Sequence, residues 1–231
     1  MAAAELAVAG PQDRGRWSAE DIRRALLLYA VTDRSWLAGR TLASCVRAAL
    51  AGGATFVQLR EKRAAPADAL ALARELAGVC RAAGVPFVVD DDMELAREAG
   101  ADGVHVGQGD TSCAEARRAL GPNAIVGVSA QTVDQALAAE RDGADYLGVG
   151  ALHPIATKPD AADVATEGLR RICAAVSIPV VGIGGIDARS ATGLAGTGVC
   201  GAAVVSALFA ASNVEVAARD LRVVLARAVG A

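Results

Sequence analysis

The sequence predicts a single (β/α)8 barrel of the TIM type, and three observations lead to this prediction. Short runs rich in Val, Ile and Leu alternate with Ala-rich stretches of helical spacing, which is typical of βα units around a parallel sheet. Eight such runs and eight helical stretches fit into 231 residues, close to the shortest length that the barrel needs. With 53% hydrophobic and 21% charged residues, the composition suits one large core in one soluble domain.

The strands are expected at the apolar runs and the helices between them. The strand runs cover residues 26–31, 55–60, 86–90, 103–106, 124–129, 145–150, 178–185 and 198–208. The helical stretches cover residues 41–51, 66–83, 92–99, 112–120, 131–142, 164–175, 187–195 and 214–228. The alternative architecture, an open doubly wound sheet, would normally carry its phosphate-binding glycines after the first strand. Here the run GIGG follows the seventh strand, which favours the barrel.

Residues 1–22 are expected to form a loose extension ending in a short helix, and residues 23–231 the barrel domain. Ser18, with Asp21 three residues later, has the pattern of a capped helix start. The first residues make a poor targeting sequence, because Glu5 interrupts the apolar stretch and no basic residue precedes it. No segment offers the roughly 18 consecutive apolar residues of a membrane span.

Composition and charge exclude several classes of partner. The formal charge is −3 with acidic and basic residues interspersed, and only 3% of residues are aromatic, so neither an electrostatic footprint nor a stacking surface for nucleic acid is present. The 5 cysteines are far apart and include no Cys-x-x-Cys pair, which argues against a disulfide framework or a zinc site. A reduced, cytoplasmic setting fits best, and the sequence is compatible with a homo-oligomer.

The stretch FVQLREKR, residues 56–63, places polar side chains where a buried strand should be apolar. Side chains alternate between the two faces of a strand, and one face of this run carries Gln58, Arg60 and Lys62. A strand that is covered on both faces should be apolar on both. The polar groups therefore indicate a ligand, although a structural ion-pair layer inside the barrel is the alternative for Gln58 and Arg60.

Other strand ends are polar as well, and in such a barrel the active site lies at the carboxyl ends of the strands. The polar residues that end or follow the remaining runs are Asp90, Asp91, Asp92, Asp110, Ser129, Thr157, Lys158 and Ser206. Arg and Lys suit phosphate oxygens, while two separated carboxylates suit a magnesium ion that bridges phosphates. Asp91 and Asp110 could supply that pair. GIGG and the VVS of strand eight match the position where many barrels hold a phosphate monoester.

Taken together, the segments QLREK, DDDMELA, DGVHVGQGD, TKPDA, VVGIGGI and VVSA resemble those of thiamine-phosphate synthases. The resemblance covers roughly residues 27–209, and the joint set in this order is far more specific than any one motif. It implies a transferase that joins 4-amino-2-methyl-5-(diphosphooxymethyl)pyrimidine to 4-methyl-5-(2-phosphooxyethyl)thiazole. The products are thiamine phosphate and pyrophosphate.

The resemblance also implies roles for individual residues. The residues expected to hold the pyrimidine diphosphate are Gln58, Arg60, Lys62, Ser129 and Lys158. Asp91 and Asp110 would bind Mg²⁺. The groups expected at the thiazole phosphate are Thr157, the amide of Gly185, Val205 and Ser206. The expected catalytic residues are four of those that hold the pyrimidine diphosphate: Arg60, Lys62, Ser129 and Lys158.

The mechanism that the resemblance implies requires no protein nucleophile. The C–O bond to pyrophosphate breaks first, and the electron-rich aminopyrimidine stabilises the resulting methylene cation before the thiazole nitrogen attacks. The metal and the basic side chains would neutralise charge on the leaving oxygens. The connection of residues 150–163 is expected to be a long loop that closes over the cation and excludes water.

Two positions depart from the family pattern. Asp90 stands where the family commonly has Asn, and an ionised carboxylate there would repel pyrophosphate unless a metal or a proton intervenes. We expect Asp90 to line the diphosphate site all the same. Ile155 stands on the thiazole side where the loop more often carries Thr.

Simpler interpretations remain for some of these residues. Asp92 is expected to cap the following helix, and His105 to be a hydrogen-bonded core residue rather than a base. Two other functions remain open beside the transferase. A thiazole tautomerase-like isomerase is disfavoured by the intact QLREK, Asp91 and Asp110. A non-catalytic thiamine-phosphate binding protein stays open because of Asp90 and Ile155.

Overall fold

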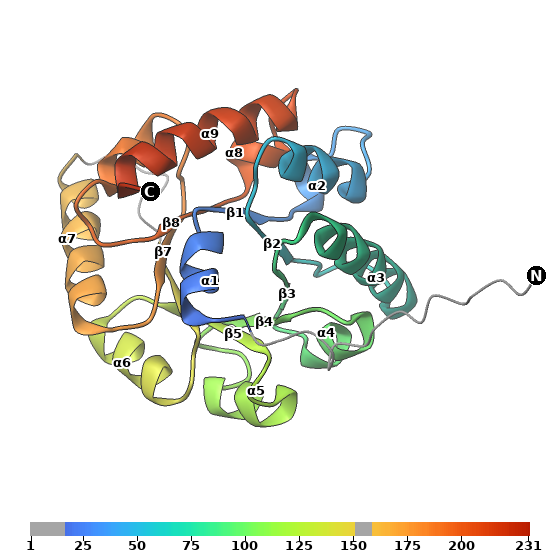
Figure 1. Cartoon of the computed structure of the whole chain (residues 1–231), viewed down its shortest axis with the longest axis horizontal. Helices are drawn as coiled ribbons and strands as arrows, with labels where there is room; N and C mark the ends of the chain where they lie inside the picture. The colour runs from blue at the N-terminus through green and yellow to red at the C-terminus, as the bar shows by residue number, and fades with distance from the viewer. Residues whose placement is uncertain (1–16, 151–158) are drawn as a thin grey trace, which may run out of the picture.

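The computed structural model describes residues 17–150 and 159–231, and the side chains of 159–165 are left undescribed. Eight parallel strands close into a barrel in the order β1 to β8, with β8 pairing to β1 (Figure 1). The strands are β1 Leu28–Val31, β2 Phe56–Leu59, β3 Phe87–Asp90, β4 Gly103–Val106, β5 Ile125–Ala130, β6 Tyr146–Val149, β7 Val180–Ile183 and β8 Gly201–Val204. The predicted barrel is therefore confirmed, and the open-sheet alternative was wrong.

Helices surround the barrel wall and connect successive strands (Figure 1). The α-helices are α1 Ala19–Ala25, α2 Leu42–Ala51, α3 Pro66–Ala83, α4 Met93–Ala99, α5 Cys113–Leu120, α6 Val133–Arg141, α7 Pro159–Ala175, α8 Ser206–Phe209 and α9 Val214–Val229. The 3-10 helices are η2 Arg34–Trp36 and η3 Ser190–Leu194. In the described residues, no helix is both long and apolar enough to cross a bilayer.

In the later part of the chain, the bounds predicted from the sequence were wrong for one helix, one strand and one loop. The helix expected at 187–195 is only η3, because Gly193 within it and Gly196 just after it, with a φ of 69°, disfavour a longer helix. The strand expected at 198–208 is the four-residue β8, followed by α8. The loop expected over 150–163 ends earlier, because α7 begins at Pro159, and Pro is well tolerated in a first helical turn.

Two apolar layers pack on the two faces of the strands. One fills the space between the wall and the helices and includes the outward-facing Leu28 and Ala30. The other fills the barrel interior and includes Tyr29, Phe56 and Tyr146. Because alternate residues of each strand enter the two layers, the strands are almost continuously apolar, as the sequence runs predict.

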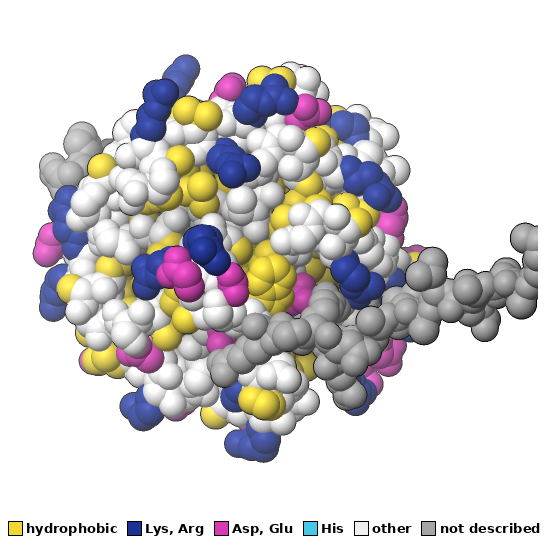
Figure 2. Space-filling model, in the orientation of Figure 1, with side chains coloured by type: hydrophobic (Ala, Val, Ile, Leu, Met, Phe, Trp, Pro, Cys, Tyr) yellow, Lys and Arg dark blue, Asp and Glu magenta, His cyan; other side chains and the backbone are white. Residues whose placement is uncertain are grey.

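Helix α1 closes the barrel at the amino ends of its strands (Figure 1). The Ser18 hydroxyl accepts from the Asp21 amide, and the Asp21 carboxylate accepts from the Ser18 amide, which confirms the predicted cap. Ile22 and Leu26 are 1% and 0% exposed and pack with the interior layer. Basic and acidic side chains gather over α1 on its outer face (Figure 2). The boundary placed between the extension and the barrel domain at residues 22 and 23 stays a prediction.

Gly127 of β5 makes room for Tyr146, one of the two tyrosines of the interior layer. A Cβ atom on Gly127 would lie 2.1 Å from Cζ of the Tyr146 ring, far inside van der Waals contact. Tyr146 itself is 0% exposed and lies edge-on to Tyr29 and Phe56, with ring centroids 5.9 and 5.5 Å away. The glycine therefore lets an aromatic cluster fill the barrel beneath the carboxyl ends of the strands.

We predict that Ile22→Ala lowers the free energy of unfolding by about 2–4 kcal/mol, because it opens a cavity between α1 and the barrel interior. Urea denaturation of the full chain measures the change. Arg24→Ala on the same helix is the control, since that side chain is 67% exposed, and it should change stability by less than about 0.5 kcal/mol. Equal small effects of both variants would contradict the closure of the barrel by α1.

Candidate active site

A cavity of about 270 Å³ opens at the carboxyl ends of the strands, and residues from all eight strands or the loops after them line it. The lining residues are Tyr29, Val31, Asp33, Gln58, Arg60, Asp90, His105, Ser129, Gly148, Val181, Ile183, Ala203 and Val205. Larger hollows lie beside α1 and between α3 and α4, with about 720 and 920 Å³. The smaller cavity is the candidate active site, because basic, acidic and neutral polar groups converge on it.

The end of β1 fixes the backbone that carries Gln58 and Arg60. Thr32 is 0% exposed, its amide donates to the Gln58 carbonyl over 3.0 Å, and its hydroxyl accepts from the Arg60 amide over 2.9 Å. A buried hydroxyl that replaces the strand ladder in this way holds Arg60 at the rim, with its side chain 48% exposed. Gln58 is 4% exposed and projects into the barrel.

Two cations from the end of β2 face two carboxylates from the end of β3. Lys62 Nζ lies 3.0 Å from Asp90 Oδ2 and also contacts Asp91, while Arg60 Nε lies 3.6 Å from Asp90 Oδ2. Burial alone would lower the pKa of Lys62, but its bonds to Asp91 and Asp90 outweigh burial and raise it. Burial and the neighbouring Asp91 charge raise the pKa of Asp90 above its ordinary value, against the effect of Lys62.

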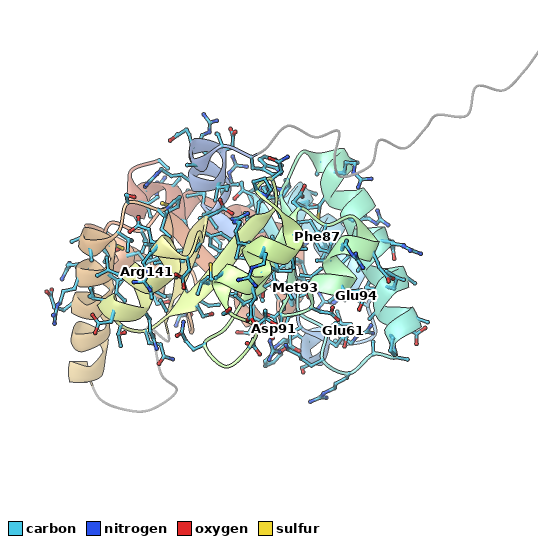
Figure 3. The ribbon with its side chains drawn as sticks, turned by 90° about the horizontal axis from the view of Figure 1, so that it is seen from below. Glu61, Phe87, Asp91, Met93, Glu94 and Arg141 are labelled. Atoms are coloured by element: carbon cyan, nitrogen blue, oxygen red, sulfur yellow. The ribbon has the colours of Figure 1, made fainter. Side chains whose placement is uncertain are left out.

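Asp91 and Asp110 come together from the ends of β3 and β4. Asp91 has a φ of 60°, a left-handed conformation that Asp tolerates better than most residues. Its amide donates to the His105 carbonyl over 2.9 Å. Burial opposes ionisation of Asp91, but the hydrogen bond that its carboxylate accepts from Lys62 and the neighbouring Asp110 and Gly107 groups lower its pKa. Figure 3 shows Asp91 on the side of the barrel opposite α1.

This pair of carboxylates fits a magnesium ion. Mg²⁺ usually takes one or two protein carboxylates and keeps waters or substrate oxygens at its other positions. Asp110 influences the pKa of Asp91, so the two carboxyl groups lie near each other at this end of the barrel. Among the described residues no cluster of three or more His, Cys, Asp or Glu side chains could hold a metal. Asp92 is not part of this pair, because its carboxylate caps α4 through the Leu95 amide at 2.8 Å, as predicted.

A buried chain of hydrogen bonds crosses the floor of the cavity. Gln58 Nε2 donates to the Tyr29 hydroxyl over 2.7 Å, which lies 2.8 Å from the Tyr146 hydroxyl. His105 Nδ1 lies 2.9 Å from the Tyr146 hydroxyl, and His105 Nε2 lies 2.9 Å from Ser129 Oγ. Burial lowers the pKa of His105 to about 4, so the imidazole is neutral at pH 7. The prediction that His105 is a hydrogen-bonded core residue is confirmed.

The loops after β7 and β8 lie beside each other, since these strands are paired. Gly184 and Gly185 have φ of 99° and 66°, a backbone that most other residues would adopt only with strain. Val205 lines the cavity, and Ser206 is the first residue of α8. Many barrels hold a phosphate monoester at this place, between the loops after the seventh and eighth strands.

Three residues predicted for the site lie outside the described residues, namely Ile155, Thr157 and Lys158. Of the predicted site residues that are described, the cavity lining includes Gln58, Arg60, Asp90, Ser129 and Val205. Lys62, Asp91 and Asp110 adjoin it through the ion pairs and hydrogen bonds above. Gly185 and Ser206 stand at the same end of the barrel, outside the lining.

Sequence reasoning missed four polar residues that organise the site: Tyr29, Thr32, Glu61 and Tyr146. The Glu61 side chain is 3% exposed, contacts Arg34, and accepts from the amides of Arg63 and Ala64 over 2.9 and 3.1 Å. It thus orders the loop that carries Lys62. A carboxylate two residues after an apolar strand, and two and three residues before the amides it bonds, was the available signal.

Comparison with known proteins identifies close relatives. The profile of a family described as thiamine monophosphate synthase matches residues 28–208. A thiamine-phosphate synthase of Moorella thermoacetica is 47% identical over 204 residues, 88% of this chain and 97% of its own. One of Chloroflexus aurantiacus is 50% identical over 196 residues, 84% of this chain and 90% of its own. The solved thiamine phosphate pyrophosphorylase of Pyrococcus furiosus is 39% identical, with a TM-score of 0.82 over 90% of this chain and 100% of that one.

We predict that Glu61→Gln lowers the free energy of unfolding by about 1–3 kcal/mol at neutral pH, since the amides of the loop lose the charge-assisted acceptor that the covered Glu61 side chain provides. Burial would raise the pKa of Glu61, but Arg34 and the loop amides lower it below 4.5. The stability that Glu61 contributes is therefore present above that value and lost as the pH falls below it. Urea denaturation of both proteins across this range measures the difference.

Glu75→Gln is the matched control, because Glu75 pairs with Arg47 at the surface, where both side chains are about half exposed. The Glu75→Gln substitution should lower the free energy of unfolding by no more than about 1 kcal/mol at any pH. A Glu61→Gln effect that stays constant down to acid pH would show that the carboxylate charge contributes nothing.

Proposed function

The chain belongs to the thiamine monophosphate synthase family, and we propose that its barrel mouth holds a magnesium pyrimidine diphosphate beside a thiazole phosphate. The reaction condenses 4-amino-2-methyl-5-(diphosphooxymethyl)pyrimidine with 4-methyl-5-(2-phosphooxyethyl)thiazole, giving thiamine phosphate and pyrophosphate. The relatives that match over most of the chain carry this synthase name, which sets aside the isomerase and the non-catalytic binding protein.

The single observation that carries the proposed site is the contact of Arg60 and Lys62 with the carboxylates of β3. A diphosphate offers both cations charge-assisted hydrogen bonds, so it can replace Asp90 and Asp91 as their partner. Lys158, which lies outside the described residues, would add a third cation. Arg60, Lys62 and Lys158 would then face the leaving pyrophosphate.

Asp91 and Asp110 would hold Mg²⁺ through one carboxylate each. When bound, the ion would neutralise negative charge on the diphosphate. The chain contributes the two carboxylates at adjacent strand ends, and it fixes them through the Gly107 amide, which donates to Asp110 Oδ2 over 3.1 Å. A site with two protein ligands leaves positions for substrate oxygens and water.

The two organic halves would occupy opposite sides of the cavity. Gln58 and Ser129 line the side under the diphosphate residues, so we place the aminopyrimidine against them. Val205 lines the other side, and the Gly185 amide and Ser206 adjoin it, so the thiazole phosphate would lie there. Thr157 and Ile155 would complete this side from the loop that lies outside the described residues.

The residues of this site would act by position and charge, without a covalent step on the protein. Arg60, Lys62 and Lys158 would stabilise charge on the leaving oxygens, and Ser129 would help to orient the pyrimidine. The segment of residues 150–163 would exclude water from the methylene cation. Within it, helix α7 already begins at Pro159.

We also propose a cytoplasmic setting and small-molecule substrates, with no nucleic acid or membrane partner. The 5 cysteines are free thiols, and burial raises the pKa of Cys80 to about 12 and of Cys113 to about 11, as suits a reducing compartment. A homo-oligomer stays a prediction, as does the division into an extension and a barrel domain.

We predict that Asp91→Asn raises the Mg²⁺ concentration for half-maximal activity at least about tenfold, since one anionic ligand is lost. A coupling assay with both substrates, titrated with MgCl₂ after EDTA treatment, measures it. Asp92→Asn is the matched control, because Asn caps a helix as well as Asp does and the metal dependence should stay unchanged. Full activity of the wild type in EDTA, or equal effects of the two variants, would overturn the metal site.

We predict that Asp90→Asn lowers the KM for the pyrimidine diphosphate about threefold to tenfold, because Arg60 and Lys62 lose a competing carboxylate. The effect should shrink as ionic strength rises. The same coupling assay, with Mg²⁺ and diphosphate substrate varied in turn, measures it. An unchanged KM for both would remove Asp90 from the site.

A further inference from the structure

The hydrogen-bonded chain on the cavity floor joins the two residues placed against the aminopyrimidine. It begins at Gln58 on β2 and ends at Ser129 on β5, with β3 and β4 between these strands, and both residues line the same cavity. Its inner members, Tyr29, Tyr146 and His105, are 1%, 0% and 8% exposed. In the described part of the chain, every buried side-chain nitrogen or oxygen has a hydrogen-bond partner.

The direction of donation along this chain follows from its first member. The Gln58 Nε2 group can only donate, so the Tyr29 hydroxyl accepts from it. The described residues offer one other partner to the Tyr29 hydroxyl, the Tyr146 hydroxyl, so the Tyr29 proton points there. The Tyr146 proton then points to its second partner, Nδ1 of His105.

The same direction determines which ring nitrogen of His105 carries the proton and whether the Ser129 hydroxyl donates or accepts. A neutral imidazole that accepts at Nδ1 carries its proton on Nε2, and this proton is donated to Ser129 Oγ. Ser129 therefore accepts from the protein, and its own hydroxyl proton remains for a ligand in the cavity. At the other end, the Oε1 atom of Gln58 has no partner among the described residues and remains as an acceptor.

We propose that Tyr29, Tyr146 and His105 are positioning residues that orient Gln58 as an acceptor and Ser129 as a donor for the aminopyrimidine. An amino group beside a ring nitrogen presents one donor and one acceptor, which matches this pair. A chain of hydrogen bonds with the opposite direction would make Gln58 the donor and Ser129 the acceptor, so the amino group and the ring nitrogen would have to exchange places. The inference rests on the proposed place of the pyrimidine.

The barrel wall is shaped to hold these side chains. A Cβ atom on Gly127 would overlap the Tyr146 ring, and one on Gly148 would lie 3.2 Å from Cε1 of His105. Phe56 packs against Tyr29 with ring centroids 4.5 Å apart. The side chains therefore have little freedom to rotate out of the chain, and its direction is maintained.

The first test reads the histidine tautomer in the unmodified protein. The chain has 2 histidines, so ¹⁵N-histidine labelling gives two ring systems, and a His153→Gln variant assigns them. The expected result at neutral pH is His105 protonated at Nε2 and unprotonated at Nδ1. A proton on Nδ1 would overturn the proposal, whatever the substrates are.

The second test separates the two substrates. Tyr146→Phe and Tyr29→Phe each remove a hydroxyl from the hydrogen-bonded chain on the cavity floor. We expect each variant to raise the KM for the pyrimidine diphosphate about tenfold. The KM for the thiazole phosphate should change less than about twofold, since no member of the chain faces that half. Tyr146→Phe should also give a mixture of His105 tautomers in the labelled protein.

Phe56→Leu is the matched control, because it loosens the packing around Tyr29 and Tyr146 and removes no hydrogen bond. It should lower stability and leave both KM values near those of the wild type. The proposal would be contradicted if both KM values rose equally in Tyr146→Phe, or if Phe56→Leu gave the same increase. Either result would show that the hydrogen-bonded side chains act only through packing. An inactive wild type would contradict the assigned reaction but leave the tautomer test standing.

Discussion

The contact between the cations after β2 and the carboxylates at the end of β3 is the constraint on which the site depends. Charges this close to the barrel interior are costly unless each has a partner, and Lys62 with Asp90 and Asp91 meets that condition in the ligand-free chain. A metal and a diphosphate would exchange these partners together, the metal taking carboxylates and the anion taking cations. Each ligand then releases the groups that the other needs, so their binding should be mutually favourable.

Beneath these charges the barrel is closed by neutral groups. The aromatic cluster of Tyr29, Phe56 and Tyr146 fills the interior, and its hydroxyls are used up in bonds to one another, to Gln58 and to His105. Charged groups are thus confined to the rim, where water and ligand can reach them. Because the floor is packed and satisfied, side chains at the rim are held at fixed positions, as a site that acts by orientation requires.

Much of this arrangement was predictable from the sequence, because polar residues at the ends of apolar strands stand out against a wall that should be apolar. The same reasoning could not find Tyr29 and Tyr146, which read as ordinary strand residues. Their hydroxyls meet only because barrel closure brings β1 and β6 across the interior from each other. The helix predicted at 187–195 is short for a local reason, because Gly193 and Gly196 disfavour helix there, and apolar spacing does not reveal this.

The separation of charge has a consequence for the chemistry. In the proposed reaction, negative charge would grow on the oxygens near Arg60 and Lys62 as the bond to pyrophosphate breaks, so these contacts would strengthen in the transition state and no protein nucleophile would be needed. Positive charge would grow on the pyrimidine side, above the floor. There, burial keeps His105 neutral, since its pKa is lowered to about 4, and no cation of the floor opposes the developing charge. A protonated imidazole in the same place would repel it. The hydroxyl chain that satisfies both ring nitrogens of His105 in its neutral form would therefore help to make the cavity suitable for a cationic intermediate.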